Sequence, residues 1–384
     1  MQKNIKLLSW FNFFTDFKLY SPIMILYFAK VTGSFALGMS IFSIAMIASA
    51  FFEVPTGVLS DYVGRKRTVS FGAFSAVLYA IFYAIGSFYW ILLIGAIFEG
   101  LSRSFYSGNN DALLHDSLYE KGEVRHYEEY LGRISSMFQI ALAVSAVIGS
   151  IIANWSFSLV MWISVIPQAI CFILSFFLIE PNVRSKESAN IFIHLKKAIM
   201  LFVKNKKLRL LNLSSVIKYA IGESTFHFQA AFYVLVWPIW AIGISKLLSY
   251  IGASFSFFYS GRILKKYRHI KLLITSALYN RIVTIIAVVY PTVFSPVLMS
   301  STSLFFGVSE VAKNSLFQKE FKKDVRATMG SLNAFAGNVV FGVFAYFLGY
   351  IADIFSPTMA ILFFQILSLP IIWLYWKIYK LDKK

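Results

Sequence analysis

The chain has 384 residues, of which 58% are hydrophobic, 18% aromatic and only 14% charged, with a mean hydropathy of +0.68. Soluble proteins average about 45–50% apolar and about 25% charged residues, so this composition excludes most soluble enzymes. A transmembrane helix needs about 20 mainly apolar residues, and the chain is long enough for twelve of them joined by short loops. The composition therefore predicts an all-α integral membrane protein.

Apolar windows predict twelve transmembrane helices in two groups of six, because one long basic segment interrupts the series at its middle. We expect an N-terminal six-helix bundle at 1–180, a cytoplasmic linker with an amphipathic helix at 181–209, and a C-terminal six-helix bundle at 210–384. The predicted spans fall at residues 7–29, 34–58, 68–87, 89–113, 133–153, 157–180, 210–235, 239–261, 270–290, 294–316, 329–352 and 357–377.

Basic residues are distributed very unevenly between the two sides of this topology. Of the 36 Lys and Arg residues, 29 fall in the termini, the linker and the loops of one side, Lys30 alone falls on the other, and six lie within spans. Loops rich in Lys and Arg stay in the cytoplasm. The sequence therefore predicts a multi-pass protein of the cell (inner or plasma) membrane with both termini in the cytoplasm. The net charge of +18 needs no nucleic acid partner.

The loop between the second and third predicted spans combines glycines with charged residues. The two glycines permit a tight turn, the aspartate can accept hydrogen bonds at the positive end of a facing helix, and Arg65 could pair with a carboxylate at the cytoplasmic end of the fourth span. We interpret this set as a gate, although the basic residues could instead serve only as topology signals. The predicted gate comprises Gly57, Asp61, Gly64, Arg65, Lys66, Asp111 and Asp116.

The segment from Gly57 to Arg67 resembles the signature loop of the major facilitator superfamily, G-x-x-x-D-x-x-G-R-K/R-K/R. The segments Glu53–Thr56 and Ser107–Ser117 resemble prokaryotic twelve-helix members of the drug-efflux-like group. This resemblance implies two pseudo-symmetric bundles that work by alternating access. It also implies proton-coupled export of small hydrophobic or amphipathic compounds.

Ionisable residues within the predicted spans are candidates for binding a substrate or protons, because such residues are costly in a bilayer. Asp16 is a candidate proton carrier, or alternatively a structural partner of Lys218 or Arg281. The pairs Glu99 with Arg103 and Glu223 with His227 stand four residues apart, which places each pair on one helix face. The candidate residues are Asp16, Glu99, Arg103, Lys218, Glu223, His227 and Arg281.

The sequence lacks a phosphate-binding glycine loop, a His-Glu-x-x-His motif and a Gly-x-Ser-x-Gly motif, and it holds one cysteine. We therefore expect no enzyme activity, no cofactor, no metal site and no ATPase, and an ion gradient, most simply of protons, as the energy source. The expected partners are a small-molecule substrate and the lipid bilayer, with the chain a monomer. Two alternatives stay open: uptake or facilitated transport of a polar metabolite, and a non-transporting receptor or polytopic enzyme.

Overall fold

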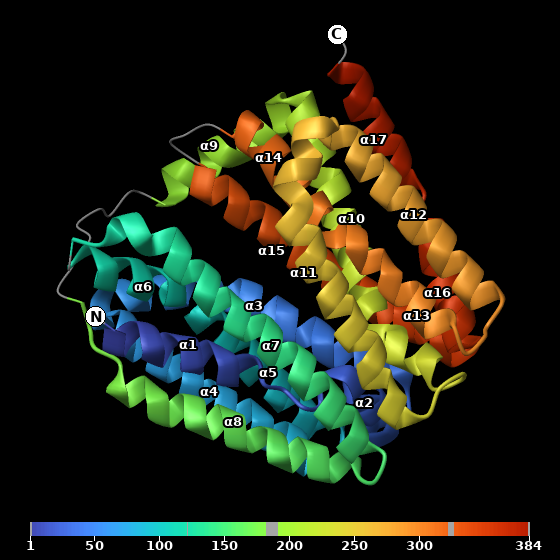
Figure 1. The fold of residues 1–384 in the computed structure, drawn as a ribbon, viewed down its shortest axis with the longest axis horizontal. Coiled ribbons are helices and arrows are strands. Elements are labelled where there is room, and N and C mark those ends of the chain that lie inside the picture. Colours follow the sequence, from blue (N-terminus) through green and yellow to red (C-terminus); the bar gives the residue numbers. More distant parts are fainter. Residues whose placement is uncertain (1, 121, 182–190, 322–325, 383–384) are drawn as a thin grey trace. The chain divides into compact units, whose positions relative to one another are not determined.

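The computed structural model describes residues 2–120, 122–181, 191–321 and 326–382. Every regular element in these ranges is a helix, which confirms the predicted all-α class. The helices group into two compact units (Figure 1). Unit 1 comprises residues 1–186 together with 238–247, and unit 2 comprises residues 187–237 and 248–384.

In its described residues, unit 1 contains eight α-helices and two short 3-10 helices, together with a 3-10 helix and the start of one further helix from later in the chain. Helix α4 packs against both α5 and α8, and α3 packs against α5 (Figure 1). The elements are α1 (Gln2–Asp16), η1 (Ser21–Ile23), α2 (Met24–Thr32), α3 (Phe35–Val63), α4 (Arg65–Ile85), α5 (Tyr89–Tyr106), α6 (Asn109–Tyr119), η2 (Val124–His126), α7 (Tyr127–Ala153), α8 (Phe157–Phe177), η3 (Ile239–Ala241) and the first residues of α11 (Ile242–Lys266).

The first predicted span is not one continuous helix. Helix α1 ends at Asp16, and the chain resumes as a 3-10 turn at Ser21 with Pro22 in its first turn, followed by α2. Proline lacks an N–H group and disfavours a helical conformation in the residue before it. Asp16 and Tyr20, although four residues apart, therefore do not share one helix face, because Tyr20 lies beyond the end of α1.

Helix α7 carries a stripe of small residues at four-residue spacing, Ala141, Ser145, Gly149 and Ala153, and all four are buried. Such stripes let helix backbones approach closely. The approach is closest at Gly149, where an added Cβ atom would lie 1.7 Å from the carbonyl oxygen of Leu19. The interrupted first span is therefore packed directly against α7.

Unit 2 contains the remaining helices. Helices α10 and α15 pack against each other, as do α12 and α14 (Figure 1). Its elements are α9 (Ile191–Lys204), α10 (Lys206–Tyr233), α11 from Leu248 onward, α12 (His269–Val289), α13 (Ser295–Ser300), η4 (Ser301–Phe305), α14 (Phe306–Glu320), α15 (Arg326–Ile354), α16 (Pro357–Leu367) and α17 (Pro370–Leu381).

The predicted linker falls partly outside the described residues, because residues 182–190 are not among them. Its second part forms α9, whose Ala198 is fully buried in a core cluster with Leu208 and Met329, while Ile199 and Val203 are exposed. One face of this helix therefore packs against the rest of unit 2. The placement of its other face on a membrane surface stays a prediction.

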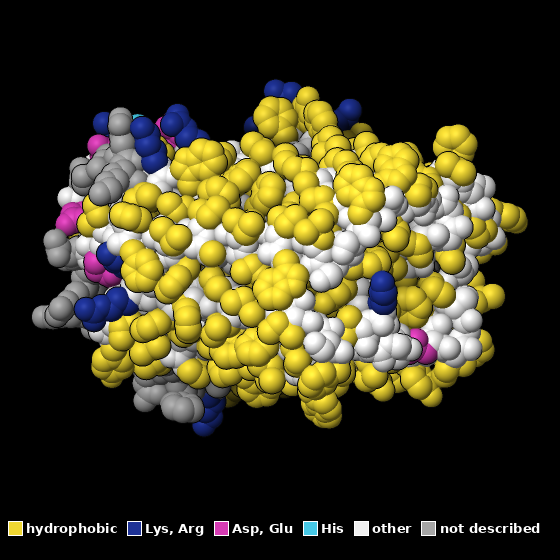
Figure 2. Space-filling model, turned by 90° about the horizontal axis from the view of Figure 1, so that it is seen from below, with side chains coloured by type: hydrophobic (Ala, Val, Ile, Leu, Met, Phe, Trp, Pro, Cys, Tyr) yellow, Lys and Arg dark blue, Asp and Glu magenta, His cyan; other side chains and the backbone are white. Residues whose placement is uncertain are grey.

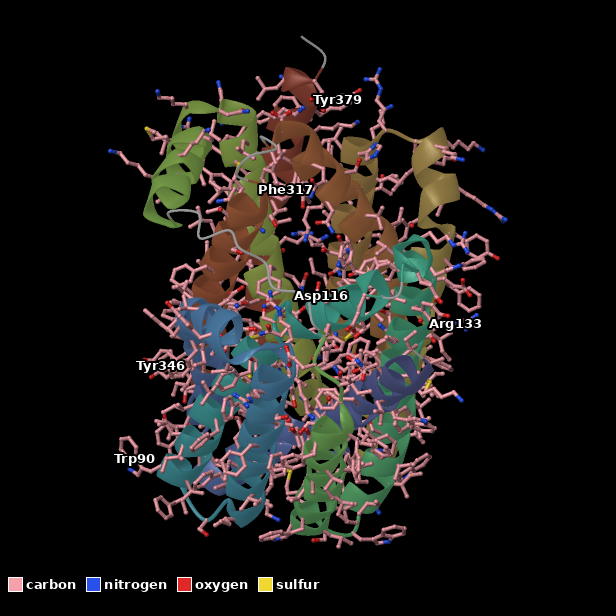
Figure 3. All side chains as sticks on the ribbon, turned by 90° about the vertical axis from the view of Figure 1, so that its left-hand side faces the viewer. Trp90, Asp116, Arg133, Phe317, Tyr346 and Tyr379 are labelled. Atoms are coloured by element: carbon pink, nitrogen blue, oxygen red, sulfur yellow. The ribbon has the colours of Figure 1, made fainter. Side chains whose placement is uncertain are left out.

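Among the residues that the structure describes, eight helical segments are long and apolar enough to cross a membrane. Hydrophobic side chains cover much of the face shown in Figure 2, and the charged side chains of this face gather mainly at one end of it. Trp90, for example, is 65% exposed and points away from the helices (Figure 3). The eight segments are Phe35–Ser60, Arg65–Ile85, Val124–Ala153, Phe157–Phe177, Ile239–Lys266, His269–Val289, Thr328–Ile354 and Pro357–Leu381.

The four predicted spans outside this set are the first, fourth, seventh and tenth. Three of them are interrupted: the first at 17–20, the fourth at Ser107–Gly108, where Gly108 has φ +70°, and the tenth by η4. The seventh, α10, is continuous but contains Lys218 and Glu223. The four spans outside the set of eight thus occupy equivalent positions in the two halves of the sequence.

The contact at Gly149 gives a direct test of the packing in unit 1. Gly149→Ala should lower the free energy of unfolding by about 3 kcal/mol or more, because the added methyl group overlaps a backbone oxygen that cannot rotate away. Cys171 is the one cysteine of the chain and is fully buried in unit 1. Thermal unfolding of the detergent-solubilised protein can therefore be followed with a thiol-reactive fluorophore.

Gly132→Ala on the same helix is the matched control, because a Cβ atom there meets no described atom within 4 Å. Alanine is favoured over glycine in a helix by about 1 kcal/mol, so this variant should unfold at the wild-type temperature or slightly above it. Equal behaviour of the two variants would show that α7 does not pack as described.

Candidate functional site

The ionisable residues of the first and fourth spans come together inside unit 1. Glu99 on α5 is 5% exposed and accepts hydrogen bonds from Arg103 at 2.8 and 3.0 Å. Its second carboxylate oxygen accepts a hydrogen bond of 2.8 Å from the Tyr83 hydroxyl of α4. Glu99 and Arg103 thus form the ion pair that their four-residue spacing predicts, while 41% of the Arg103 side chain stays exposed.

Asp16 lies at the end of α1, and its electrostatic neighbours in unit 1 are Lys18 and Arg103. Lys18 in turn is within electrostatic range of Glu99, and its ammonium group stands 5.6 Å from the centre of the Tyr79 ring. The cluster therefore combines two carboxylates with two basic groups. Sequence reasoning missed Lys18, because residues two apart do not face each other on a helix; only the break after Asp16 brings them together.

Aromatic rings enclose this cluster on one side. Tyr83 packs against Tyr79 with ring centres 5.7 Å apart, against Phe28 at 5.1 Å and against Tyr20 at 6.3 Å. Tyr20 and Tyr83 are 2% and 1% exposed. The charged groups of unit 1 thus sit against a buried aromatic wall, which strengthens their mutual attraction by excluding water.

A second charged cluster joins the seventh and tenth spans inside unit 2. Lys218 of α10 lies 3.7 Å from Glu310 of α14, and Lys313, one turn along α14, contacts the other oxygen of the same carboxylate. Glu310, which was not among the candidate residues, is thus the shared acceptor of two lysines. The spacing of three residues between Glu310 and Lys313 is the signal that would have predicted the pair.

Arg281 of α12 extends this second cluster. It is 7% exposed and donates hydrogen bonds to the backbone oxygens of Ala277, at 2.6 Å, and Ser368, at 2.8 Å. Ser368 lies in the break between α16 and α17. Arg281 lies within electrostatic range of Lys218 and of Tyr375 of α17. Its Nε atom is buried and makes no hydrogen bond to a described residue.

Glu223 and His227 lie further along α10, with His227 Nε2 3.9 Å from Glu223 Oε2. About a quarter of the His227 side chain and about a third of the Glu223 side chain are exposed. The two side chains therefore face each other as predicted, at a distance near the upper limit for an ion pair. Lys246, which is 5% exposed, lies in the part of α11 grouped with unit 1.

The predicted gate lies at the turn from α3 to α4. The Arg65 guanidinium donates hydrogen bonds to Ser60 Oγ at 2.9 Å and to Asn109 Oδ1 at 3.1 Å, which joins this turn to the start of α6. The recorded partner of Asp116, also on α6 (Figure 3), is His115 at 3.5 Å. These two hydrogen bonds join the turn to α6, and the pairing of Arg65 with Asp111 or Asp116 stays a prediction.

The remaining gate residues are placed as follows. Gly57 lies inside α3 rather than in the turn. Asp61 belongs to the last turn of α3, but its side chain lies outside the described part of the structure. Asp111 occupies the first turn of α6, where a negative charge is favourable.

Glu180, just beyond the end of α8, was missed by sequence reasoning. Its two carboxylate oxygens accept hydrogen bonds from the backbone N–H groups of Arg65, at 2.7 Å, and Lys66, at 2.6 Å. Gly64 has φ +94°, and an added Cβ there would lie 2.7 Å from Glu180 Oε1. Glycine is thus required both by the backbone conformation and by this carboxylate, which ties the sixth span to the start of α4.

The first, fourth and sixth spans of each half meet in a polar contact at equivalent ends. In unit 1, the Asn4 side chain bonds Ser117 Oγ at 3.1 Å and both backbone polar groups of Ile179, at 3.0 and 2.9 Å.

In unit 2, Lys207 lies 2.9 Å from Glu320 and 2.6 Å from Asp382. Partial burial lowers the pKa of Lys207, but the two carboxylates outweigh it, so the pKa rises above its usual value and the lysine stays charged. In each half, polar contacts thus join the first, fourth and sixth spans at one end of the unit.

The sequence matches the model of the Major Facilitator Superfamily over residues 7–344, so the chain belongs to this family of transporters. Together with the apolar helices, this membership establishes a multi-pass membrane protein.

Two curated relatives are described as uncharacterised transporters of Buchnera aphidicola. The one from subspecies Acyrthosiphon pisum is 29% identical over 188 residues, which is 48% of this chain and 46% of that protein. The one from subspecies Schizaphis graminum is 27% identical over 188 residues, 49% of this chain and 44% of that protein. The chain thus aligns with less than half the length of these relatives.

Several solved transporters share the fold. The nucleoside transporter NupG has a TM-score of 0.81 at 16% identity, covering 98% of this chain and 99% of its own. A bacterial homologue of the lysosomal transporter Spinster has a TM-score of 0.77 at 11% identity, covering 99% and 97%. A POT family transporter in complex with 5-aminolevulinic acid has a TM-score of 0.71 at 13% identity, covering 96% and 94%. At these identities the likeness concerns the fold alone.

The contact between Glu180 and α4 generates a test. Glu180→Ala should lower the stability of unit 1 by about 1 kcal/mol, because two N–H groups at the start of a helix lose a charged acceptor. Glu180→Gln should cost less, since it keeps one oxygen acceptor. The thermal unfolding of unit 1, followed through Cys171, measures both effects.

Glu129→Gln is the control, because it removes a carboxylate from an ion pair with Arg133 whose side chains are 52% and 66% exposed. Such pairs contribute little, and this variant should unfold like the wild type. A Glu180→Ala protein as stable as Glu129→Gln would contradict the role assigned to Glu180.

Proposed function

We propose that this chain is a secondary active transporter that moves a small polar metabolite across the membrane by alternating access. The observation that carries the proposal is the position of its buried charges. Each unit places ionisable side chains on its first and fourth spans, with Asp16, Glu99 and Arg103 in unit 1 and Lys218 and Glu310 in unit 2. A membrane protein retains such costly groups where they face a polar pathway.

The kinds of solute named for proteins with this fold agree with a polar substrate. One such protein is a nucleoside transporter, and another is a POT family transporter in complex with 5-aminolevulinic acid. Polar solutes need hydrogen-bonding and charged partners inside the membrane, and both clusters supply them.

Proton-coupled export of hydrophobic or amphipathic compounds, as in the drug-efflux-like group, is the second candidate. The buried aromatic wall around Tyr83, with Phe28 and Tyr79 beside it, favours this alternative. Aromatic rings next to carboxylates suit flat or cationic ligands. The two candidates differ in the solutes they predict, so one panel of solutes separates them.

We further propose that the transporter works as a monomer in the cell (inner or plasma) membrane, with both termini in the cytoplasm. The excess of Lys and Arg on one side of the predicted topology supports this orientation. The turn from Gly57 to Lys66 would then lie at the cytoplasmic side. There it would act as a gate, with Asp61, Asp111 and Asp116 as its acidic members and residues 181–209 as the tether between the bundles.

Asp16 is our proposed proton carrier, because it lies at a break in the first span and shares its cluster with Lys18 and Arg103. A carboxylate in such a position can release and regain a proton as its surroundings change during transport. The pairs Glu99–Arg103 and Glu223–His227 are the next candidates for this role.

The test uses proteoliposomes, with uridine, a dipeptide, succinate and ethidium as labelled solutes, with and without a pH gradient. The polar-metabolite proposal predicts gradient-dependent movement of at least one polar solute and none of ethidium. Asp16→Asn should abolish accumulation of that solute while sparing exchange at equal pH. The reason is that the amide keeps the shape of the site but cannot cycle a proton.

Glu129→Gln, which removes a carboxylate from an exposed ion pair, should keep both activities. Accumulation at the wild-type rate in Asp16→Asn would show that Asp16 is structural. Movement of ethidium alone would favour the export function instead.

A further inference from the structure

The two charged clusters differ in their balance of charge. In unit 1, the carboxylates of Asp16 and Glu99 are matched by the basic groups of Lys18 and Arg103. In unit 2, the cluster described above has three basic side chains, Lys218, Lys313 and Arg281, and one acidic side chain, Glu310. Within the described residues, only the cluster of unit 2 thus carries an excess of positive charge.

The other ionisable groups of unit 2 do not remove this excess. Glu223 lies five residues beyond Lys218 on α10, and its carboxylate is 3.9 Å from Nε2 of His227. Even if Glu223 is counted, three basic side chains face two acidic ones. Tyr375, which is 1% exposed, adds a hydroxyl group near Glu310 and Arg281 but no charge of its own at neutral pH.

The geometry gives the cluster an open side and a closed side. The side chains of Lys218 and Glu310 are 28% and 23% exposed, whereas Arg281 is 7% exposed and retains a buried Nε atom without a described partner. Lys218 lies 3.7 Å from Glu310, a loose contact, while Lys313 holds the same carboxylate more closely. The ammonium group of Lys218 can therefore turn to a ligand without leaving Glu310 unpaired.

We propose that the cluster formed by Lys218, Lys313 and Arg281 binds an anionic group, a carboxylate or a phosphate, on the transported solute. Lys218 contacts the anion directly, and Arg281 stabilises it from behind. This inference rests on the proposed transport of a polar metabolite and narrows it to solutes that carry a negative charge. An anion of one or two charges neutralises the excess inside the membrane, so its binding removes an electrostatic cost that the empty site bears.

The experiment compares matched pairs of anionic and neutral compounds on the full-length protein in nanodiscs. The pairs are glycerol 3-phosphate with glycerol and succinate with succinamide, at an ionic strength matched with NaCl. Thermal unfolding followed by tryptophan fluorescence reports binding. We expect at least one anion to raise the unfolding temperature saturably and its neutral counterpart to have no effect.

Three variants locate the site. Lys218→Gln should weaken the apparent affinity for that anion at least tenfold, and Lys218→Arg, which keeps the charge, should lose less. Lys377→Gln removes a positive charge from α17, where the ammonium group lies 3.4 Å from the centre of the Trp373 ring, and it should bind as the wild type does. The unfolding temperature of each variant without ligand shows whether it folds, and Lys218→Arg provides a second variant of the same position if Lys218→Gln does not fold.

The outcomes separate this inference from the function on which it rests. The inference would be overturned if neither anion raised the unfolding temperature, or if the neutral compounds raised it equally. It would also be overturned if Lys218→Gln bound the anion with the wild-type affinity. Transport of neutral solutes without anion binding would leave the proposed function standing and refute the inference. Anion binding that depends on Lys218, without movement of the anion into proteoliposomes, would support the site and refute transport.

Discussion

The high cost of a charge inside a bilayer is the constraint on which the rest of this structure depends. An ionisable side chain at the centre of a transmembrane helix costs about 2.5–3.5 kcal/mol on the most lenient scale. Six basic residues nevertheless lie well inside the predicted spans: Lys18, Arg103, Lys218, Lys246, Arg281 and Lys313. The structure meets this cost by gathering charges of opposite sign within each unit. Glu99 is held by Arg103 and Tyr83, and Glu310 by Lys218 and Lys313.

The same constraint explains why the first, fourth, seventh and tenth spans differ from the others. Eight helical segments of the described chain are long and apolar enough to cross a membrane, whereas the four remaining spans carry the ion pairs of Glu99 with Arg103, Lys218 with Glu310, and Glu223 with His227. Three of these four are also interrupted, at 17–20, at Ser107–Gly108 and at η4. A break frees backbone groups, which is tolerated in a membrane only where protein surrounds them. Polar side chains and irregular backbone therefore occur together, and the two halves of the chain repeat the arrangement.

The sequence was sufficient to predict what depends on composition and on local spacing. The apolar windows predicted the all-α membrane fold, and a spacing of four residues predicted the pair of Glu99 with Arg103. The continuous first span was predicted wrongly, because Pro22 acts together with close packing against α7 and an apolar window does not register either effect. Lys18 was missed for the same reason.

Contacts between residues far apart in the chain could not be read from spacing. Glu180 lies 115 positions from Arg65, and two further spans lie between those of Lys218 and Glu310. No local pattern records that these side chains will meet, since their proximity follows from the folding of each bundle. The repeat between the halves was the available signal. Had it been applied to the charged residues of the first and fourth spans, it would have directed attention to Lys218 and Glu310 together.

The central claim is that charges on the first and fourth spans of a unit are energetically coupled. A double-mutant cycle on Lys218→Met and Glu310→Gln, with stability measured by thermal and denaturant unfolding, tests it most directly. We predict a coupling energy of about 1–3 kcal/mol, because each single change leaves a buried charge with fewer partners. Effects that add within about 0.3 kcal/mol would show that the two side chains are independent, and would contradict the account.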